Sequence, residues 1–204
     1  NIYYLRNNDN YMWFKIKLND DSYIKKNNSI PENIKLTDDK FKLLWDLRPD
    51  NKPIIKIYGK DITCPRYFQN YGIDYIFSNV KHNSKPIPDI LQPYLEYVNT
   101  IENKTYNNIL VNWYEDNSNY IGYHADNEKQ LIKESNIYCF SFGDSREFYL
   151  KHNVNKTVNK YTLNNNSCIV MGGKCQQYYK HSIPKTKKII NKRISITLRQ
   201  FDTT

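Results

Sequence analysis

The closing segment Arg193-Ile194-Ser195-Ile196-Thr197-Leu198-Arg199 alternates polar and apolar side chains without a break. Successive side chains of a β-strand point to opposite faces, so the alternation predicts a strand whose Ile194, Ile196 and Leu198 pack into the core. Arg193 and Arg199 then share the other face, about 20 Å apart along the strand.

Similar short runs precede this segment through the whole second half of the chain. Polar clusters of Asn, Asp, Ser and Gly separate them at roughly 8–12-residue intervals, which is typical of a β-sandwich or barrel. The expected strands are 109–114, 120–124, 137–142, 147–151, 160–163, 168–171, 178–183 and 194–201.

The first half of the chain supplies the helices. Thr37 is a candidate N-cap for a helix that Arg48-Pro49 ends, and residues 88–101 show a second helical stripe. Residues 54–62 read as a strand pair broken at Tyr58-Gly59, and 71–77 as a further strand region. Residues 11–18 are an apolar patch that could form a strand or a loosely held arm. We therefore expect one domain, an antiparallel β-core with N-terminal helices.

Charge and hydropathy limit the class of protein. The 204 residues carry 30 Lys and Arg against 21 Asp and Glu, a net charge of +9, which favours a polyanionic partner, nucleic acid before membrane. Mean hydropathy is −0.80, and no apolar run approaches the roughly 20 residues of a membrane span. No secretory signal is visible at the start. Membrane-spanning, collagen-like and disulfide-scaffold classes are excluded, and we expect a monomer.

The four cysteines show no CxxC pair and no zinc-ribbon spacing. We expect reduced thiols in an intracellular, reducing compartment, with nucleus or cytoplasm left open. The abundance of Asn, Ile, Lys and Tyr, whose codons are AT-rich, suggests a protist or large DNA virus as the source.

His124-Ala125-Asp126 is the candidate metal motif. On a strand, residues i and i+2 share a face at about 6.6 Å, so an imidazole and a carboxylate can converge on one cation. His181 lies in another strand-like run and offers a third ligand. Two His and one carboxylate leave half an octahedron open, which suits a non-haem Fe(II) oxygenase. The alternative is a surface His–Asp hydrogen bond.

The two arginines of the last strand could grip both ends of a short dicarboxylate, because guanidinium groups bind carboxylates in bidentate fashion. Asn112 and Tyr114 place polar groups on one face of an upstream strand. The alternative is that Arg193 and Arg199 lie on the solvent face of an edge strand.

Together these residues resemble the AlkB family of Fe(II)- and 2-oxoglutarate-dependent nucleic-acid dioxygenases. The resemblance covers roughly residues 55–201, and within the family it is strongest to the branch that repairs double-stranded DNA. Its ordered matches are Ile57-Tyr58-Gly59-Lys60, Pro65-Arg66, Tyr75-Ile76-Phe77-Ser78, Asn112-Trp113-Tyr114, His124-Ala125-Asp126-Asn127-Glu128, Ser141 to Phe148, Met171, His181-Ser182-Ile183-Pro184 and the R-x-x-x-T-x-R of 193–199.

The resemblance implies a double-stranded β-helix, or jelly roll, under a nucleotide-recognition lid. Residues 1–100 would form an N-terminal extension, the lid and the helices, and 101–204 the catalytic core. It further implies that Fe(II), 2-oxoglutarate and O2 are used. The iron would be held by His124, Asp126 and His181, and 2-oxoglutarate by Asn112, Tyr114, Arg193, Ser195 and Arg199. The family usually has Asn at the position of Ser195, which puts co-substrate affinity in question.

The reaction implied is oxidative demethylation of 1-methyladenine or 3-methylcytosine, which yields succinate, CO2 and formaldehyde. These lesions block pairing, which lowers the cost of flipping the base. Glu128 resembles the acid that meets the exocyclic amine of the base, and Tyr58 the finger that fills the vacated stack. Further expected substrate contacts are Arg66, Tyr75, Phe77, Ser78, Lys185, Lys187 and Lys188. The alternative for each of these residues is an ordinary packing or surface role.

Two alternatives remain open: a demethylase of RNA or a protein side-chain oxygenase, and a non-catalytic nucleic-acid-binding β-helix domain. Net charge cannot separate DNA from RNA, because both present phosphates. Fe(II) binds neutral imidazole, so iron affinity is expected to fall below roughly pH 6.5 as the histidines protonate.

Overall fold

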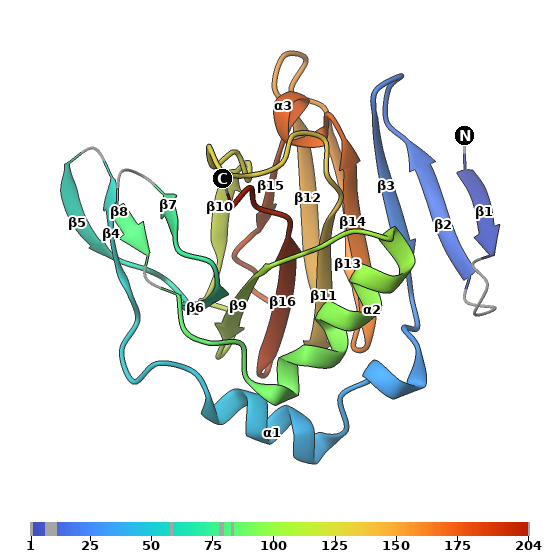
Figure 1. Ribbon diagram of the computed structural model, residues 1–204. Coiled ribbons are helices and arrows are strands. Elements are labelled where there is room, and N and C mark those ends of the chain that lie inside the picture. The colour runs from blue at the N-terminus through green and yellow to red at the C-terminus, as the bar shows by residue number, and fades with distance from the viewer. Residues whose placement is uncertain (1, 7–11, 58, 78–79, 83, 204) are drawn as a thin grey trace.

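Two antiparallel sheets form the body of the computed structural model, which describes residues 2–6, 12–57, 59–77, 80–82 and 84–203 (Figure 1). The large sheet runs in the order β1 (Ile2–Arg6), β2 (Met12–Lys17), β3 (Ser22–Asn27), β14 (Ser167–Gly173), β11 (Ile137–Gly143), β16 (Arg193–Arg199), β9 (Asn108–Tyr114) and β6 (Tyr67–Gly72). The small sheet runs β10 (Ile121–His124), β15 (Tyr179–Ile183), β12 (Arg146–His152) and β13 (Val158–Leu163). This is the expected jelly roll.

Two hairpins stand at the β6 side of the large sheet, opposite the edge formed by β1 (Figure 1). They are β4 (Ile54–Ile57) with β5 (Lys60–Thr63), and β7 (Tyr75–Phe77) with β8 (Val80–His82). The predicted break at Tyr58-Gly59 therefore falls between paired strands, although Tyr58 itself lies outside the described residues.

The helices are α1 (Asp38–Asp46), α2 (Gln92–Glu102), α3 (Cys175–Tyr178) and the 3-10 turns Glu32–Ile34 and Asp89–Leu91. As predicted, Thr37 caps α1, its hydroxyl accepting a hydrogen bond from the Lys40 amide. The strand expected over 178–183 was one residue too long, because Tyr178 ends α3. No helix in the described ranges is long and apolar enough to cross a bilayer; α2, the longest, has 11 residues.

Every residue of β16 is buried, because both faces of the sheet are covered at this strand. Ile194, Ile196 and Leu198 face α1 and α2 in one apolar cluster, as predicted, together with Trp113, whose indole N–H donates to the Leu44 carbonyl at 2.9 Å. The other face looks into the space between the sheets. The alternative of two arginines on a solvent-exposed edge is therefore wrong.

The second apolar cluster fills the space between the two sheets and reaches the site. It joins residues of β11 and β14, such as Ile137 and Ile169, to Phe148, Leu150 and Leu163 of the small sheet. The N-terminal apolar patch forms β2, a strand of the three-stranded extension that pairs onto β14 through β3.

Candidate metal and co-substrate site

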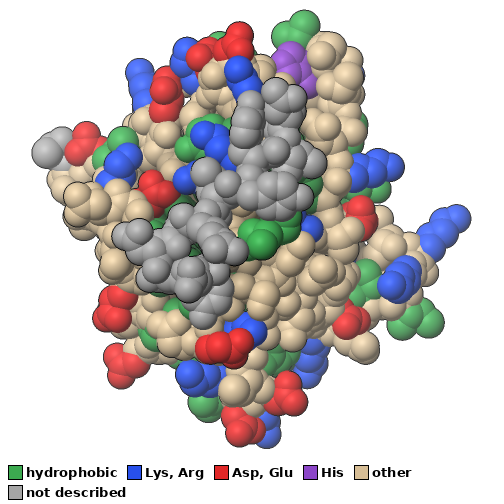
Figure 2. All heavy atoms as spheres, turned by 90° about the vertical axis from the view of Figure 1, so that its right-hand side faces the viewer, with side chains coloured by type: hydrophobic (Ala, Val, Ile, Leu, Met, Phe, Trp, Pro, Cys, Tyr) green, Lys and Arg blue, Asp and Glu red, His purple; other side chains and the backbone are tan. Residues whose placement is uncertain are grey.

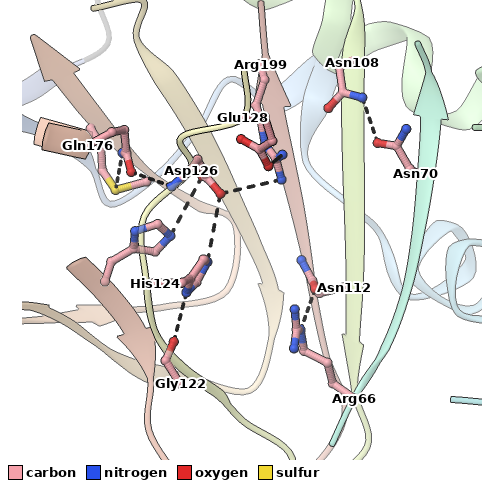
Figure 3. Close-up of polar contacts among 12 residues, drawn as sticks. Arg66, Asn70, Asn108, Asn112, Gly122, His124, Asp126, Glu128, Gln176 and Arg199 are labelled. Atoms are coloured by element: carbon pink, nitrogen blue, oxygen red, sulfur yellow. Dashed lines mark hydrogen bonds and ion pairs between the residues drawn. The ribbon is translucent and has the colours of Figure 1, made fainter. Parts of the chain in front are cut away.

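His124, Asp126 and His181 converge, as predicted. Their ligand atoms all lie within 4.8 Å of one another. The two histidines sit opposite each other on the paired strands β10 and β15, with ring centroids 4.1 Å apart. Each imidazole Nε2 lies 4.0 Å from an oxygen of the Asp126 carboxylate (Figure 3).

The reason given for this convergence was wrong in one respect. Strand β10 ends at His124, and Asp126 lies in the irregular segment that follows, so the pair does not share a strand face. The segment after the strand nevertheless brings the Asp126 carboxylate beside both imidazoles. The predicted residues therefore converge, but a segment without regular secondary structure, and not a shared strand face, sets their geometry.

The hydrogen bond to His124 determines which of its ring nitrogens faces the site. Nδ1 lies 2.9 Å from the carbonyl oxygen of Gly122, which can only accept. Nδ1 must therefore carry the proton, and Nε2 presents its lone pair toward Asp126. The His181 ring stacks on Phe148 at 5.5 Å between centroids, which fixes its plane.

The surroundings of both histidines keep them neutral. Burial lowers the pKa of His124, although Asp126 opposes the shift. Burial and the neighbouring His124 lower the pKa of His181 to about 3. For Asp126, burial alone would raise the pKa, but Arg199 and the two histidines outweigh it and lower the pKa. At neutral pH the site thus offers two neutral imidazoles and one carboxylate, the protonation states that a divalent cation requires.

Arg193 has the features of a receptor for an anionic ligand. It is fully buried, its Nε donates to the Ser141 hydroxyl at 3.0 Å, and its guanidinium stacks over Tyr114 at 4.9 Å. Within the described part of the chain, neither Nη1 nor Nη2 has a hydrogen-bond partner. Two buried, parallel donors without acceptors fit one carboxylate of a dicarboxylic acid.

The remaining residues expected at the co-substrate line the same cavity. It is bordered by Asn112, Tyr114, Arg193, Ser195 and Arg199, together with the three candidate metal ligands. Ser195 lies in register with Asn112 on one neighbouring strand and with Ser141 on the other. The lining therefore combines the donor set that Fe(II) requires with cationic and polar groups that suit the carboxylates of 2-oxoglutarate.

A second cavity adjoins the first and shares His124, Asp126 and Arg199 with it. Its other lining residues include Arg66 and Glu128, both expected at the substrate. The Glu128 carboxylate accepts from Arg199 Nη1 at 2.7 Å, so the alternative of a solvated loop glutamate is wrong. Burial raises the pKa of Glu128, while Arg199 opposes the shift.

Arg66 is buried and links the two cavities. Its Nε donates to the Asn112 side-chain oxygen at 2.7 Å (Figure 3). Its Nη1 lies 3.2 Å from the Cys64 sulfur. The guanidinium also lies 5.6 Å from the ring of Phe68. A surface arginine is therefore excluded, and the guanidinium borders the second cavity.

Other expected substrate contacts are not placed at the site by the described structure. Lys185, Lys187 and Lys188 are exposed, and the Lys185 ammonium lies over the Tyr120 ring at 4.6 Å. Tyr58 and Ser78 lie outside the described residues. Tyr75 and Phe77 belong to β7 by their backbone, and their side chains lie outside what is described.

Sequence reasoning missed three residues of the site. Phe68 lines the second cavity, and its i, i+2 spacing from Arg66 was an available signal. Cys139 lines the first cavity, as a buried free thiol. Gln176 accepts from the backbone N–H of Asp126, and no local pattern announces that contact.

Figure 2 shows basic and acidic side chains interspersed among the coloured residues of the face that carries the N-terminal strands.

Comparison with known proteins agrees with this geometry. A family model described as the 2OG-Fe(II) oxygenase superfamily matches residues 60–199. The DNA oxidative demethylase ALKBH2 of Homo sapiens is 29% identical over 158 residues, 72% of this chain and 60% of that protein. The alkB homolog 3 dioxygenase of Rattus norvegicus is 28% identical over 155 residues, 69% of this chain and 52% of that protein. The chain thus spans little more than half the length of these relatives.

A solved structure titled as that of OsALKBH1 superposes with a TM-score of 0.60 at 17% identity, covering 91% of this chain and 99% of that one. This likeness confirms the fold. Because the family model covers well over half of the chain and the relatives are AlkB homologues, the chain belongs to the 2OG-Fe(II) oxygenase superfamily, as a member of the AlkB family.

Proposed function

We propose that this chain is an oxidative demethylase of N-alkylated bases in DNA, such as 1-methyladenine and 3-methylcytosine. The observation that carries the proposal is the junction of two cavities at His124, Asp126 and Arg199, one bearing the unpaired Arg193 donors and the other Glu128 and Arg66. Several curated relatives are named DNA oxidative demethylases, which supports DNA as the polymer.

On this proposal, His124, Asp126 and His181 hold Fe(II), and Arg193 pairs with the far carboxylate of 2-oxoglutarate. Bound there, Fe(II) would supply the redox chemistry by which 2-oxoglutarate and O2 become succinate and CO2 and one oxygen atom is inserted into an N-methyl C–H bond of the base. The resulting N-hydroxymethyl group would lose its hydroxyl proton to solvent as the C–N electron pair returns to the cationic ring, which releases formaldehyde and the neutral base.

The chain's own residues orient the reactants and keep water out. Asn112, Tyr114 and Ser195 supply polar groups along the co-substrate cavity, while Leu110 and Ile121 border both cavities with apolar surface. Removing water strengthens each charged contact, because the local dielectric falls. The imidazoles of His124 and His181 are neutral at neutral pH, so both remain available as metal ligands.

On the substrate side, Glu128 is placed to accept a hydrogen bond from the exocyclic amine of a flipped base. Its negative charge favours the cationic ring of 1-methyladenine or 3-methylcytosine over an unmodified neutral base. Phe68 adds an aromatic wall, and stacking of a base on an aromatic ring contributes about 1–3 kcal/mol. We assign duplex opening and phosphate contact to Tyr58, Tyr75, Phe77, Ser78, Lys185, Lys187 and Lys188.

The test is a formaldehyde assay with 1-methyladenine and 3-methylcytosine in single-stranded DNA, duplex DNA and RNA. We expect formaldehyde and succinate from methylated DNA, and none from Asp126→Ala, which removes a metal ligand. Formaldehyde release from methylated RNA alone would show that the substrate is RNA and not DNA. Tight binding of oligonucleotide by the iron-loaded protein with no release from any polymer would make the chain a non-catalytic binder.

A further inference from the structure

Secondary structure fixes the backbone of two of the three candidate metal ligands but not of the third. His124 and His181 lie on paired strands, where ladder hydrogen bonds fix the backbone. Asp126 lies in the segment 125–128, which has no regular secondary structure. Something other than a β-ladder must therefore hold the Asp126 backbone in place.

Among the described residues, the ion-pair partners of the Asp126 carboxylate lie beyond hydrogen-bond distance. Arg199 Nη2 lies 3.8 Å away, and the two imidazole Nε2 atoms lie 4.0 Å away. These distances exceed a hydrogen bond, so the pairs attract electrostatically without fixing orientation. The short contact is made by the backbone: the Asp126 N–H donates to Gln176 Oε1 at 2.9 Å (Figure 3).

The other end of the Gln176 amide is also engaged. Its Nε2 lies 3.3 Å from the sulfur of Met171, a buried residue of β14. Gln176 belongs to the short helix α3, which directly follows β14. The side chain therefore bridges the large sheet and the loop that carries Asp126, across 50 residues of sequence.

A hollow of about 450 Å³ borders the loop on the side of α3, lined by Asp126, Asn127, Glu128, Gln176 and Gln177 among others. Glu128, further along the loop, is held separately by the hydrogen bond that it accepts from Arg199.

We propose that Gln176 is a positioning residue for the metal site: it holds the Asp126 backbone so that the carboxylate faces the two imidazoles. The inference rests on the proposed ligand set and adds a residue outside it. An amide suits the role because it accepts from the Asp126 N–H and donates to the Met171 sulfur at once. Outer partners of metal ligands commonly change metal affinity by 10–100-fold.

The test compares Gln176→Leu with Gln177→Leu, the same change at the next position of α3. We expect Gln176→Leu to weaken Mn(II) binding by about tenfold, measured as free Mn(II) by electron paramagnetic resonance. We also expect faster amide hydrogen exchange at Asp126 in the metal-free protein, because the N–H loses its acceptor. Gln177→Leu leaves both quantities near the wild-type values.

Equal Mn(II) affinities and equal Asp126 exchange in the two variants would overturn the role of Gln176. If Gln176→Leu fails to fold, Gln176→Glu provides the test, because it keeps the acceptor oxygen and must preserve slow exchange at Asp126. If the proposed ligand set is wrong, the results differ from these. The wild type itself would not bind Mn(II), or Asp126→Ala would bind Mn(II) as tightly as the wild type.

Discussion

The guanidinium of Arg199 donates to the carboxylate of Glu128 at 2.7 Å, and the two side chains are only 2% and 3% exposed. The same guanidinium lies 3.8 Å from the carboxylate of Asp126. Arg199 thus connects the acid proposed to read the base with the acid proposed to hold the metal. Because a buried ion pair costs desolvation energy, its presence at the junction of two cavities favours a functional origin over a stabilising one.

Glu128→Gln tests the proposed base contact. The amide keeps an oxygen for Arg199 but loses the negative charge that favours a cationic base. We expect kcat/KM for 1-methyladenine in DNA to fall about tenfold or more, since hydrogen bonds to charged groups contribute about 1.5–3 kcal/mol. The Mn(II) dissociation constant stays within about threefold. Glu134→Gln, an exposed glutamate of the same stretch, is the control, and equal losses in both variants would remove Glu128 from the base contact.

The pH dependence follows from the lowered histidine pKa values. His181 has a pKa of about 3 and that of His124 is also lowered, whereas both titrate near 6.5 in the unfolded chain. In the folded site His181 therefore stays neutral while the unfolded chain takes up protons. We expect metal affinity to fall only below the pH of about 6.5 at which a free imidazole titrates, because both folded pKa values are lowered.

Below about pH 6.5 the free energy of unfolding decreases as pH falls, because the unfolded state binds more protons. Mn(II) titrations and urea unfolding at each pH measure the two effects. His181→Ala should flatten the pH slope of stability. A metal affinity that drops sharply at pH 6.5 would show that the histidines titrate as exposed groups.

The sequence predicted the parts of the fold that local patterns encode. The alternation of 193–199 located β16, and Thr37 located the start of α1. It also named the three side chains that the structure brings together, His124, Asp126 and His181. It could not show that Asp126 lies beyond the strand end, since the end of a short strand leaves no periodic signal.

Contacts between distant segments escaped sequence reasoning for a different reason. The bond from Arg66 to Asn112 and the bond from Asp126 to Gln176 depend on strand order and register. Register of β6 against β9, which places Phe68 opposite Asn112, is set by packing of whole strands. A single sequence contains no local pattern from which such pairings follow.

Ser195→Ala measures what the hydroxyl contributes to the co-substrate. Ser195 is buried in the cavity between Asn112 and Ser141, and a neutral hydrogen bond contributes about 0.5–1.5 kcal/mol. We expect KM for 2-oxoglutarate to rise about two- to tenfold with kcat nearly unchanged. Arg193→Lys, which loses the planar fork, should raise KM further. An unchanged KM in Ser195→Ala would show that the hydroxyl does not touch the co-substrate.

Arg146→Lys tests a buried residue to which the sequence assigned no chemistry. Its Nη2 donates to the carbonyls of Asn119 at 2.8 Å and Pro184 at 2.7 Å, and its guanidinium lies 5.5 Å from the Tyr114 ring. It therefore ties the loop after β9 to the end of β15 beside the co-substrate cavity. A lysine ammonium cannot reproduce the planar fork, so at least one buried carbonyl loses its donor.

We expect Arg146→Lys to lower the free energy of unfolding by about 2–3 kcal/mol in urea titrations. It should also raise KM for 2-oxoglutarate, because Tyr114 lies between the guanidinium groups of Arg146 and Arg193. Arg48→Lys is the matched control: Arg48 is half-buried, stacks on Trp45 at 5.1 Å and donates to the Trp45 carbonyl at 3.0 Å. Equal destabilisation in the two variants would mean that Arg146 contributes only what any stacked arginine does, whereas a loss confined to Arg146→Lys identifies it as the link between the two sheets at the site.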